Sequence, residues 1–269
     1  MNKNINCKNC NTKFTGNFCS NCGEKVINDG DFALMKLLSQ VLDTFTHLDS
    51  KVFKTLKLLL FYPGKLSKLN TDGIRVPFMK PFQIYIIINI IFFFLFSNDD
   101  IFRVTSHYFF QENYDGIKTL AKVRDITKET GLSVTQVAEL YDSRSTNLAK
   151  GLLVFLIPII ALLGKLFHRK QNIQFGKHII FSTHLITFIL SLFVISSLFL
   201  GINSSDFVKK MVLILMGLCT LTYYTIALKT FYNNSLLISC IKGIACTILT
   251  IITFNIYKIL ISVLALYSL

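Results

Sequence analysis

The sequence predicts an all-α integral membrane protein, a helical bundle with about five transmembrane helices, preceded by a small cysteine-rich module. Of the 269 residues, 52% are apolar and only 16% are charged, whereas a soluble domain has about 25% charged residues. The mean hydropathy is +0.53, and many apolar residues fall in runs near the ~20 residues that cross a bilayer as a helix. Four of the seven cysteines lie together near the N-terminus, outside these runs.

Five apolar runs are predicted to span the membrane. They cover residues 78–97, 148–167, 179–201, 211–231 and 236–269, and together with their loops they form a bundle of residues 78–269. Pro77 and Pro81 flank the start of the first run, and Pro158 lies inside the second. The last run exceeds the ~20 residues of a span and is interrupted by Lys242 and Lys258, so its boundaries are the least defined.

The segment before the first span is predicted to have two parts, a cysteine-rich module in residues 1–27 and a linker with an amphipathic helix in residues 28–77. Between Leu34 and Leu59 the apolar residues recur at steps of three or four, which places them on one face of a helix. Lysines such as Lys51 lie between them. The helix either packs on the rest of the protein or lies in the headgroup plane with its lysines toward the phosphates, and we prefer the second interpretation.

Loop charge predicts the orientation of the bundle, because Lys and Arg collect on the cytoplasmic side. The first thirty residues are polar and lack the apolar core of a signal peptide, so a cytoplasmic N-terminus is expected. The loop after the second span is strongly basic and is also expected inside. Residues 98–147 have nearly balanced charge and are expected to form an extracytoplasmic helical loop, with Ser133 capping one helix. The loop with Lys209 and Lys210 would then lie outside, which disagrees with the rule.

The strongest motif is Cys-x-x-Cys, eight residues, then Cys-x-x-Cys followed by Gly23. Each Cys-x-x-Cys turn presents two thiolates to one ion, and two such turns complete a tetrahedral site for Zn²⁺. A cytoplasmic N-terminus disfavours disulfides, and paired turns ending in glycine favour zinc over an iron–sulfur cluster. We therefore predict a zinc ribbon with one structural Zn²⁺ that leaves no position for catalysis. Its ligands are Cys7, Cys10, Cys19 and Cys22.

Two histidines of the third predicted span form a candidate intramembrane polar site. His178 and His184 lie six residues apart, about 240° around a helix, so they do not face one direction. An ionisable residue in a span is a functional hypothesis by default. We prefer the alternative, a neutral His184 hydrogen-bonded to a neighbouring helix. No Asp or Glu lies in an apolar run, which argues against transport coupled to protons or sodium.

Basic residues near the cytoplasmic ends of the spans are candidates for contacts with anionic lipid headgroups. A simpler interpretation is that they only set the topology, and we prefer it. The candidates are Arg75, Lys80, Lys165, Arg169, Lys170 and Lys229.

Several motifs along most of the chain resemble those of a known family. They are the ribbon at 7–25, Tyr62-Pro63-Gly64, Gly73-Ile74-Arg75 before Pro81 and Tyr85, Ile157-Pro158 with 161–162 and 165–167, His178 to Ser182 with His184, and Ala227-Leu228-Lys229 with Tyr232. The chain resembles bacterial zinc-ribbon multi-span membrane proteins of unknown function (DUF3667-like). Ser20 and Glu24 depart from the family's usual ribbon, and the turn at Gly73 lacks a lysine found there. The resemblance implies a bacterial inner membrane and no assigned activity.

These features favour a membrane scaffold or adaptor, whose ribbon docks a cytoplasmic partner or whose basic surface docks anionic lipid. The alternative is a small transporter or lipid-handling protein, for which His184, Asn89 and Asn255 are the main polar groups available within spans. No P-loop, nucleophile elbow, HExxH or Rossmann fingerprint occurs, so no enzymatic activity is predicted. The expected partners are the lipid bilayer and a cytoplasmic protein, but no nucleic acid, because the ribbon has few aromatic residues and modest charge. A homo-oligomer is left open.

Overall fold

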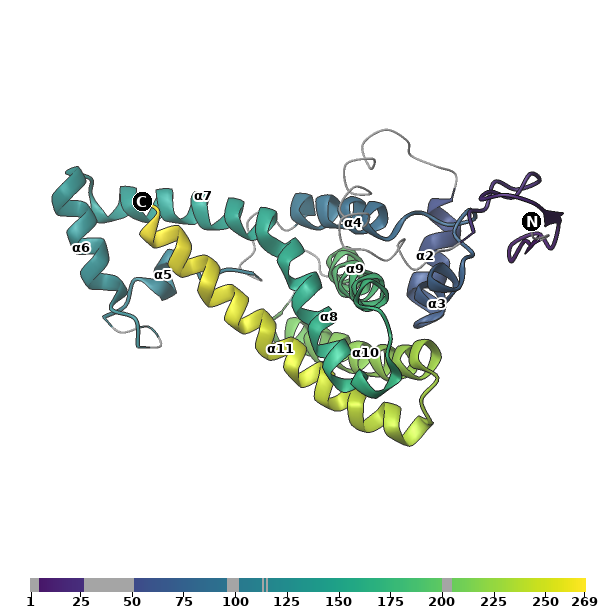
Figure 1. Cartoon of the computed structure of the whole chain (residues 1–269). Helices are drawn as coiled ribbons and strands as arrows, with labels where there is room; N and C mark the ends of the chain where they lie inside the picture. The colour runs from purple at the N-terminus through teal and green to yellow at the C-terminus, as the bar shows by residue number, and fades with distance from the viewer. Residues whose placement is uncertain (1–4, 27–50, 96–101, 113, 115, 200–204) are drawn as a thin grey trace. The chain divides into compact units, whose positions relative to one another are not determined.

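The computed structural model describes residues 5–26, 51–95, 102–112, 114, 116–199 and 205–269 (Figure 1). In chain order its elements are β1 (Ile5–Asn6), β2 (Lys13–Phe14), α2 (Val52–Phe61), α3 (Lys65–Asp72), α4 (Pro81–Leu95), α5 (Ser106–Phe109), α6 (Thr119–Thr130), α7 (Val134–Leu152), η3 (Leu153–Phe155), α8 (Leu156–Phe167), η4 (Arg169–Gln171), α9 (Phe175–Phe199), α10 (Asp206–Tyr232) and α11 (Leu236–Tyr267). The predicted class, a helical membrane protein with a cysteine module at its N-terminus, is confirmed.

The described residues form two compact units, and each is described by itself. Unit 1 comprises residues from Met1–Leu95 and Ile157–Thr247, and unit 2 comprises residues from Phe96–Leu156 and Ile248–Leu269. Unit 1 therefore contains the cysteine module, α2 to α4, α8 to α10 and the first part of α11.

Four helical segments of the described chain are long and apolar enough to cross a membrane. They are Val134–Phe167, Phe175–Ser197, Lys210–Tyr232 and Leu236–Tyr267. The first of the five predicted spans differs, because α4 has 15 residues, or about 22 Å at 1.5 Å per residue. A hydrocarbon core is about 30 Å thick. The end of that predicted span, at residues 96–97, lies outside the described residues.

The helix predicted after Ser133 is confirmed, and it continues into the second predicted span, residues 148–167. The helical segment starts at Val134, where the side chain of Ser133 accepts a hydrogen bond from the Gln136 amide and forms a capping box. The short 3-10 turn η3 separates α7 from α8 just before Pro158. Proline has no amide proton and its ring clashes with the carbonyl four residues earlier, here Val154, so a regular α-helix is interrupted at this point.

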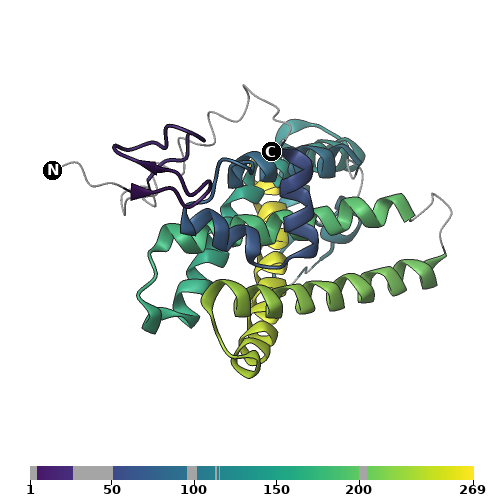
Figure 2. The same ribbon diagram turned by 90° about the vertical axis from the view of Figure 1, so that its right-hand side faces the viewer.

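Helix α9 is the central element of unit 1. It contacts α2, α3, α4 and α10 (Figure 2) and is buried on all sides over most of its length. Its small hydroxyl residues bond to their own backbone: Thr183 Oγ1 donates to the Ile179 carbonyl at 2.7 Å, and Thr187 Oγ1 to the Thr183 carbonyl at 2.6 Å. These bonds satisfy the hydroxyls internally and let neighbouring helices approach closely.

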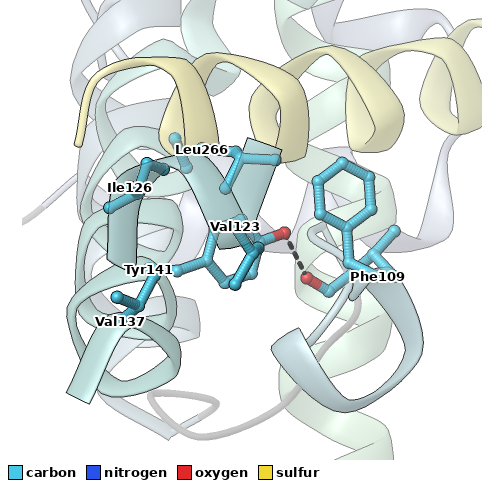
Figure 3. Packing of buried hydrophobic residues seen from close by; sticks show 8 residues of the cluster. Phe109, Val123, Ile126, Val137, Tyr141 and Leu266 are labelled. Atoms are coloured by element: carbon cyan, nitrogen blue, oxygen red, sulfur yellow. Dashed lines mark hydrogen bonds between the residues drawn. The ribbon is translucent and has the colours of Figure 1, made fainter. Parts of the chain in front are cut away.

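Unit 2 has its own hydrophobic core between α5, α6, α7 and the end of α11 (Figure 3). The rings of Phe109 and Tyr141 stack with centroids 5.5 Å apart, and Tyr141 Oη donates to the Val104 carbonyl at 2.7 Å. The carboxylate of Asp142 accepts from the amide of Ser106, at the start of α5, at 3.0 Å. The segment at 98–147 thus contributes α5, α6 and most of α7 to this core.

The predicted amphipathic helix is described only in its last part. Residues 32–50 lie outside the described residues, and α2 covers the remainder. Thr55 and Leu59 of α2 are buried, whereas Phe53 and Phe61 are 83% and 74% exposed. The helix therefore packs on unit 1 and also presents aromatic side chains outward.

Candidate metal centre and the polar helix junction

The cysteine module consists of two similar turns, each closed by a short antiparallel pairing. Around the first turn β1 pairs with β2, with Ile5 opposite Phe14. Around the second, Phe18 pairs with Lys25. Each pair of cysteines therefore lies at the tip of a small hairpin, and the two tips face one another.

The same hydrogen bonds shape both turns. In the first, the amide of Asn11 donates to the Cys7 carbonyl at 2.9 Å, and in the second the amide of Gly23 donates to the Cys19 carbonyl at 2.9 Å. Asn11 has φ 57° and Gly23 has φ 72°, the left-handed conformation that glycine and asparagine tolerate. From the sequence, a tight turn was predicted at Gly23 but not at Asn11. Asparagine also tolerates the left-handed conformation, so its residue type could have indicated the other turn.

The four cysteines could hold one metal ion. Their Sγ atoms all lie within 4.8 Å of one another, and no disulfide joins them. The Sγ atoms of Cys7 and Cys22 are 3.5 Å apart, as are those of Cys10 and Cys19. A tetrahedron with Zn–S bonds of about 2.3 Å has edges of about 3.8 Å. The four thiols thus fit a tetrahedral ion closely.

The surroundings of the cysteines suit a structural site. Cys7 and Cys19 are buried together with Phe14, and Ile5 and Val26 pack against them. Hydrogen bonds to Thr12 lower the pKa of the Cys10 thiol to about 6, which favours the thiolate form that binds metal. Against a backbone hydrogen bond to Glu24, burial and the neighbouring cysteines raise the pKa of Cys22 to about 12. All four positions around an ion would be filled by protein, so this centre offers no open coordination position.

One acidic side chain connects the cysteine module to the helices. Glu24, the second residue after Cys22, is 4% exposed. Its Oε2 accepts hydrogen bonds from the amides of Arg75 and Val76, both at 3.0 Å. These amides lie between α3 and α4, more than fifty residues along the chain. Apart from the departure of Glu24 from the family pattern, no sequence feature predicted this contact.

The two predicted intramembrane histidines have separate partners. The Nδ1 atom of His184 lies 2.8 Å from Ser67 Oγ on α3, and that of His178 lies 2.7 Å from Tyr232 Oη on α10. Both rings are buried. Each histidine therefore joins α9 to another element. His184 Nε2 has no hydrogen-bond partner among the described residues.

A third histidine, His168 in the basic loop after the second predicted span, is buried in the same region. The ring of His168 stacks on that of Tyr232 with centroids 3.6 Å apart. Its Nδ1 lies 2.9 Å from the Gly164 carbonyl, and its Nε2 lies 3.0 Å from the amide nitrogen of Asn234. A neutral ring with its proton on Nδ1 donates to the first and accepts from the second.

These contacts define a polar helix junction where α8 and α10 end and α9 and α11 begin. Gln171 donates to the carbonyl of Tyr232 at 3.2 Å, and Lys68 Nζ donates to Asn233 Oδ1 at 2.8 Å. Lys242 Nζ donates to the carbonyl of Phe167, at the end of α8, at 2.9 Å. The junction residues are Lys68, His168, Gln171, Tyr232, Asn233, Asn234 and Lys242.

Protonation of His168 should weaken the fold at low pH. Burial, together with the charge of Lys242, lowers the pKa of His168 to about 4, although the hydrogen bond to the Gly164 carbonyl opposes this shift. Since the ordinary value is 6.5, the unfolded chain binds this proton more readily than the folded chain between about pH 6.5 and 4. Stability should therefore fall as the pH decreases through that window.

The measurement is the thermal unfolding of the detergent-solubilised protein from pH 7 to 4. His168→Gln lacks the titrating ring and should show a smaller loss of stability over the same range. An equal loss in both proteins would show that His168 does not contribute to the pH dependence.

The structure separates the six basic candidates for lipid contact into two groups. Arg75 is partly buried, and its Nε donates to the Asn70 carbonyl at 3.0 Å; Lys80 is exposed just before α4. The other four are exposed near the ends of α8 and α10. They are Lys165, Arg169, Lys170 and Lys229.

The fold and the site define a class, a helical membrane protein with a tetracysteine module packed against its first helices. Residues 49–93, which include α2, α3 and most of α4, match the model of a family described as a protein of unknown function (DUF3667). The chain is thus DUF3667-like, as the sequence motifs predicted. No curated protein and no solved structure matches the chain.

Proposed function

We propose that the protein is a zinc-ribbon membrane adaptor, held at anionic lipid by the basic end of its helical bundle and docking a cytoplasmic protein through its ribbon. The observation that carries the proposal is the charge of the polar helix junction, where several helix ends meet. Apolar helices anchor the chain in the bilayer, and the ribbon provides a closed metal centre that can shape a binding surface but cannot catalyse a reaction.

The charge near the junction is strongly one-sided. Residues 51–95 and 157–247 contain 15 basic residues and two acidic residues, Asp72 and Asp206. Asp206, Lys209 and Lys210 all lie at the start of α10, whose 27 residues place them about 35–40 Å from the junction. Without these three, 13 basic residues and one acidic residue remain in the two ranges. Exposed cations beside the ends of membrane helices are attracted to anionic headgroups by about 1 kcal/mol each. The same excess of positive charge supports a cytoplasmic location of this end and of the ribbon.

The ribbon is the part suited to a protein partner. Its four thiolates are soft ligands in a tetrahedral arrangement, which supports zinc as the ion. Phe18, between the two cysteine turns, is 61% exposed, and Lys8 at the tip of the first turn is exposed. An exposed aromatic ring on a rigid hairpin is a common anchor for protein contacts. The proposed location is a bacterial inner membrane, as the family resemblance implies.

Neutralising the basic end should remove the preference for anionic lipid. We expect the variant with Lys165, Arg169, Lys170 and Lys229 all changed to Gln to lose its selectivity for phosphatidylglycerol over phosphatidylcholine. The wild-type protein should select phosphatidylglycerol, and salt should weaken this selection because it screens surface charge. The measurement is the association of spin-labelled lipids with the reconstituted protein.

A control with the same number and type of charges lies in unit 2. Changing Lys118, Lys122, Arg124 and Lys128 to Gln removes three lysines and one arginine from the segment around α6. This variant should keep the wild-type selectivity. Equal selectivity of all three proteins, or a loss in the control alone, would contradict the proposed lipid surface.

A transporter or lipid-handling protein is the second candidate, and one observation favours it. Among the described residues, buried polar atoms of Tyr85, Asn89, Ser182 and His184 in α4 and α9 have no hydrogen-bond partner. Such groups are expensive within a membrane and often mark a polar site. Loss of solute uptake or export in His184→Ala, with unchanged lipid selectivity, would favour this candidate over the adaptor.

A further inference from the structure

We propose that Glu24 is a metal-dependent clamp, so that binding of an ion to the four cysteines docks the ribbon onto the connection between α3 and α4. The inference rests on the metal centre of the proposed function. It adds that ion binding is coupled to the position of the chain before α4. Binding of the ion would hold this segment against the ribbon, and loss of the ion would release it.

The docking site for Glu24 is made by backbone amides. Helix α3 ends at Gly73, whose φ is 105°, and the amide of Ile74 returns to the Leu69 carbonyl at 2.9 Å. This reversal provides a hydrogen-bond donor for a carbonyl in the last turn of α3. The next two amides, of Arg75 and Val76, donate to the carboxylate of Glu24. Two successive amides directed at one oxygen form a small anion-binding site. The carboxylate of Glu24 is therefore bound as a charged ligand would be.

The position of Glu24 is set by the second cysteine turn. Its own carbonyl accepts a hydrogen bond from the amide of Cys19 at 2.8 Å, and the preceding Gly23 closes the turn. A module of this size has too little apolar core to fold alone, and structural zinc sites supply its folding free energy. Without an ion the turn loses its order, and the carboxylate is no longer held toward Arg75 and Val76.

A pocket lies beside the Glu24 contact, between the ribbon and the end of α3. It is lined by ribbon residues, including Ile5, Lys8, Phe14 and Val26, and by Asp72 and Gly73 of the α3 end. The two charge-assisted hydrogen bonds of Glu24 link the ribbon directly to the chain after α3, and hydrogen bonds to a charged group are stronger than neutral ones. The two equilibria are linked. The factor by which the ion strengthens docking therefore equals the factor by which docking strengthens binding of the ion.

Hydrogen exchange of the full-length protein in nanodiscs tests the clamp. We expect the amides of Arg75 and Val76 to exchange slowly in the zinc-loaded protein and roughly tenfold faster or more after zinc is removed by a chelator. Cys7→Ser with Cys10→Ser, which removes the ion through the other turn and leaves Glu24 in place, should give the same increase. Peptides from α9 serve as the reference and should not change.

Variants of Glu24 separate docking from metal binding. Zinc-loaded Glu24→Ala should exchange at Arg75 and Val76 as fast as the zinc-free protein, whereas Glu24→Gln keeps an acceptor oxygen and should restore part of the protection. Glu139→Ala, an exposed glutamate in α7, is the matched control and should behave as wild type. Glu24→Ala should also bind zinc more weakly in competition with a chelator.

The outcomes distinguish the clamp from the metal centre itself. If purified wild-type protein contains no metal, the zinc ribbon and the clamp both fail. If it contains metal but the exchange of Arg75 and Val76 is unaffected by chelation or by Glu24→Ala, the metal centre stands and the clamp is wrong. If chelation also accelerates exchange throughout α9, the effect is general unfolding, and the local clamp is again wrong.

Discussion

Replacing Cys7 and Cys10 with serine should reduce the metal content of the purified protein from about one zinc per chain to none. The change removes two of four thiolates whose Sγ atoms lie within 4.8 Å of one another. Serine hydroxyls are poor ligands for Zn²⁺ at neutral pH, and two remaining thiolates do not complete a tetrahedron. Structural zinc sites of this type contribute about 10–16 kcal/mol of apparent binding free energy in zinc-finger peptides, so a large loss is expected.

Elemental analysis of the purified protein measures this effect, and the chain provides a matched control. Cys219 and Cys240 are exposed cysteines of α10 and α11, away from the four clustered thiols. Changing both to serine removes the same number of thiols and should leave the zinc content unchanged. Full zinc in the Cys7 and Cys10 variant, or equal loss in both variants, would rule out the tetracysteine site.

Adding a single methyl group at Gly64 should destabilise the protein by about 3 kcal/mol. Gly64 has φ 75°, and a Cβ atom built on it would lie 2.6 Å from the Ala227 carbonyl oxygen and 2.9 Å from the Ala227 Cα. The obstacle is backbone of α10, which cannot yield by changing a rotamer. Gly64→Ala therefore combines left-handed strain of about 1–2 kcal/mol with separation of α3 from α10.

Substitutions at two other glycines distinguish the effect of backbone strain from that of the steric contact with α10. Gly131→Ala has a similar φ of 72° but open space around its Cβ, and Gly217 lies in α10 with nothing within 4 Å. Thermal unfolding in detergent should rank Gly64→Ala as the least stable variant. Gly131→Ala should lose about 1 kcal/mol, and Gly217→Ala should lose nothing. Equal effects of Gly64→Ala and Gly131→Ala would mean that the approach of α10 to Gly64 does not limit stability.

The parts of the structure that follow from local chemistry were predictable from the sequence. The four clustered cysteines were found from their spacing, because the ligands of such a site lie within short turns. Three of the five predicted spans correspond to α9, α10 and α11, whose apolar runs are long. The helix predicted after Ser133 is also confirmed as α7, since its capping box is a local signal, but its continuation into the second predicted span was not predicted. For the first predicted span, the described part of α4 covers 15 residues, and the predicted end at residues 96–97 lies outside the described residues.

The contacts that assemble the site were not predictable, because they join residues distant in the sequence. Periodicity placed His178 on a helix but could not identify Tyr232 as its partner. His168 was grouped with the basic loop residues, although stacking on Tyr232 buries it. The ribbon that contains Glu24 was predicted from its cysteine spacing alone. The role of Glu24 as a hydrogen-bond acceptor was not, because the amides of Arg75 and Val76 come close to it only in the folded chain.

The contacts of α3 also constrain how the chain can be assembled during synthesis. Ser67 bonds to a residue 117 positions later, and Lys68 to one 165 positions later. At 5–20 residues per second, the ribosome needs roughly 6–23 s to make the chain between the first pair and roughly 8–33 s for the second. The Glu24 contact, by contrast, closes within the first 76 residues. The ribbon and the α3–α4 connection can therefore join early in synthesis. Ser67 and Lys68 of α3 can form their hydrogen bonds only after α9 and α10 have been made and have entered the bilayer.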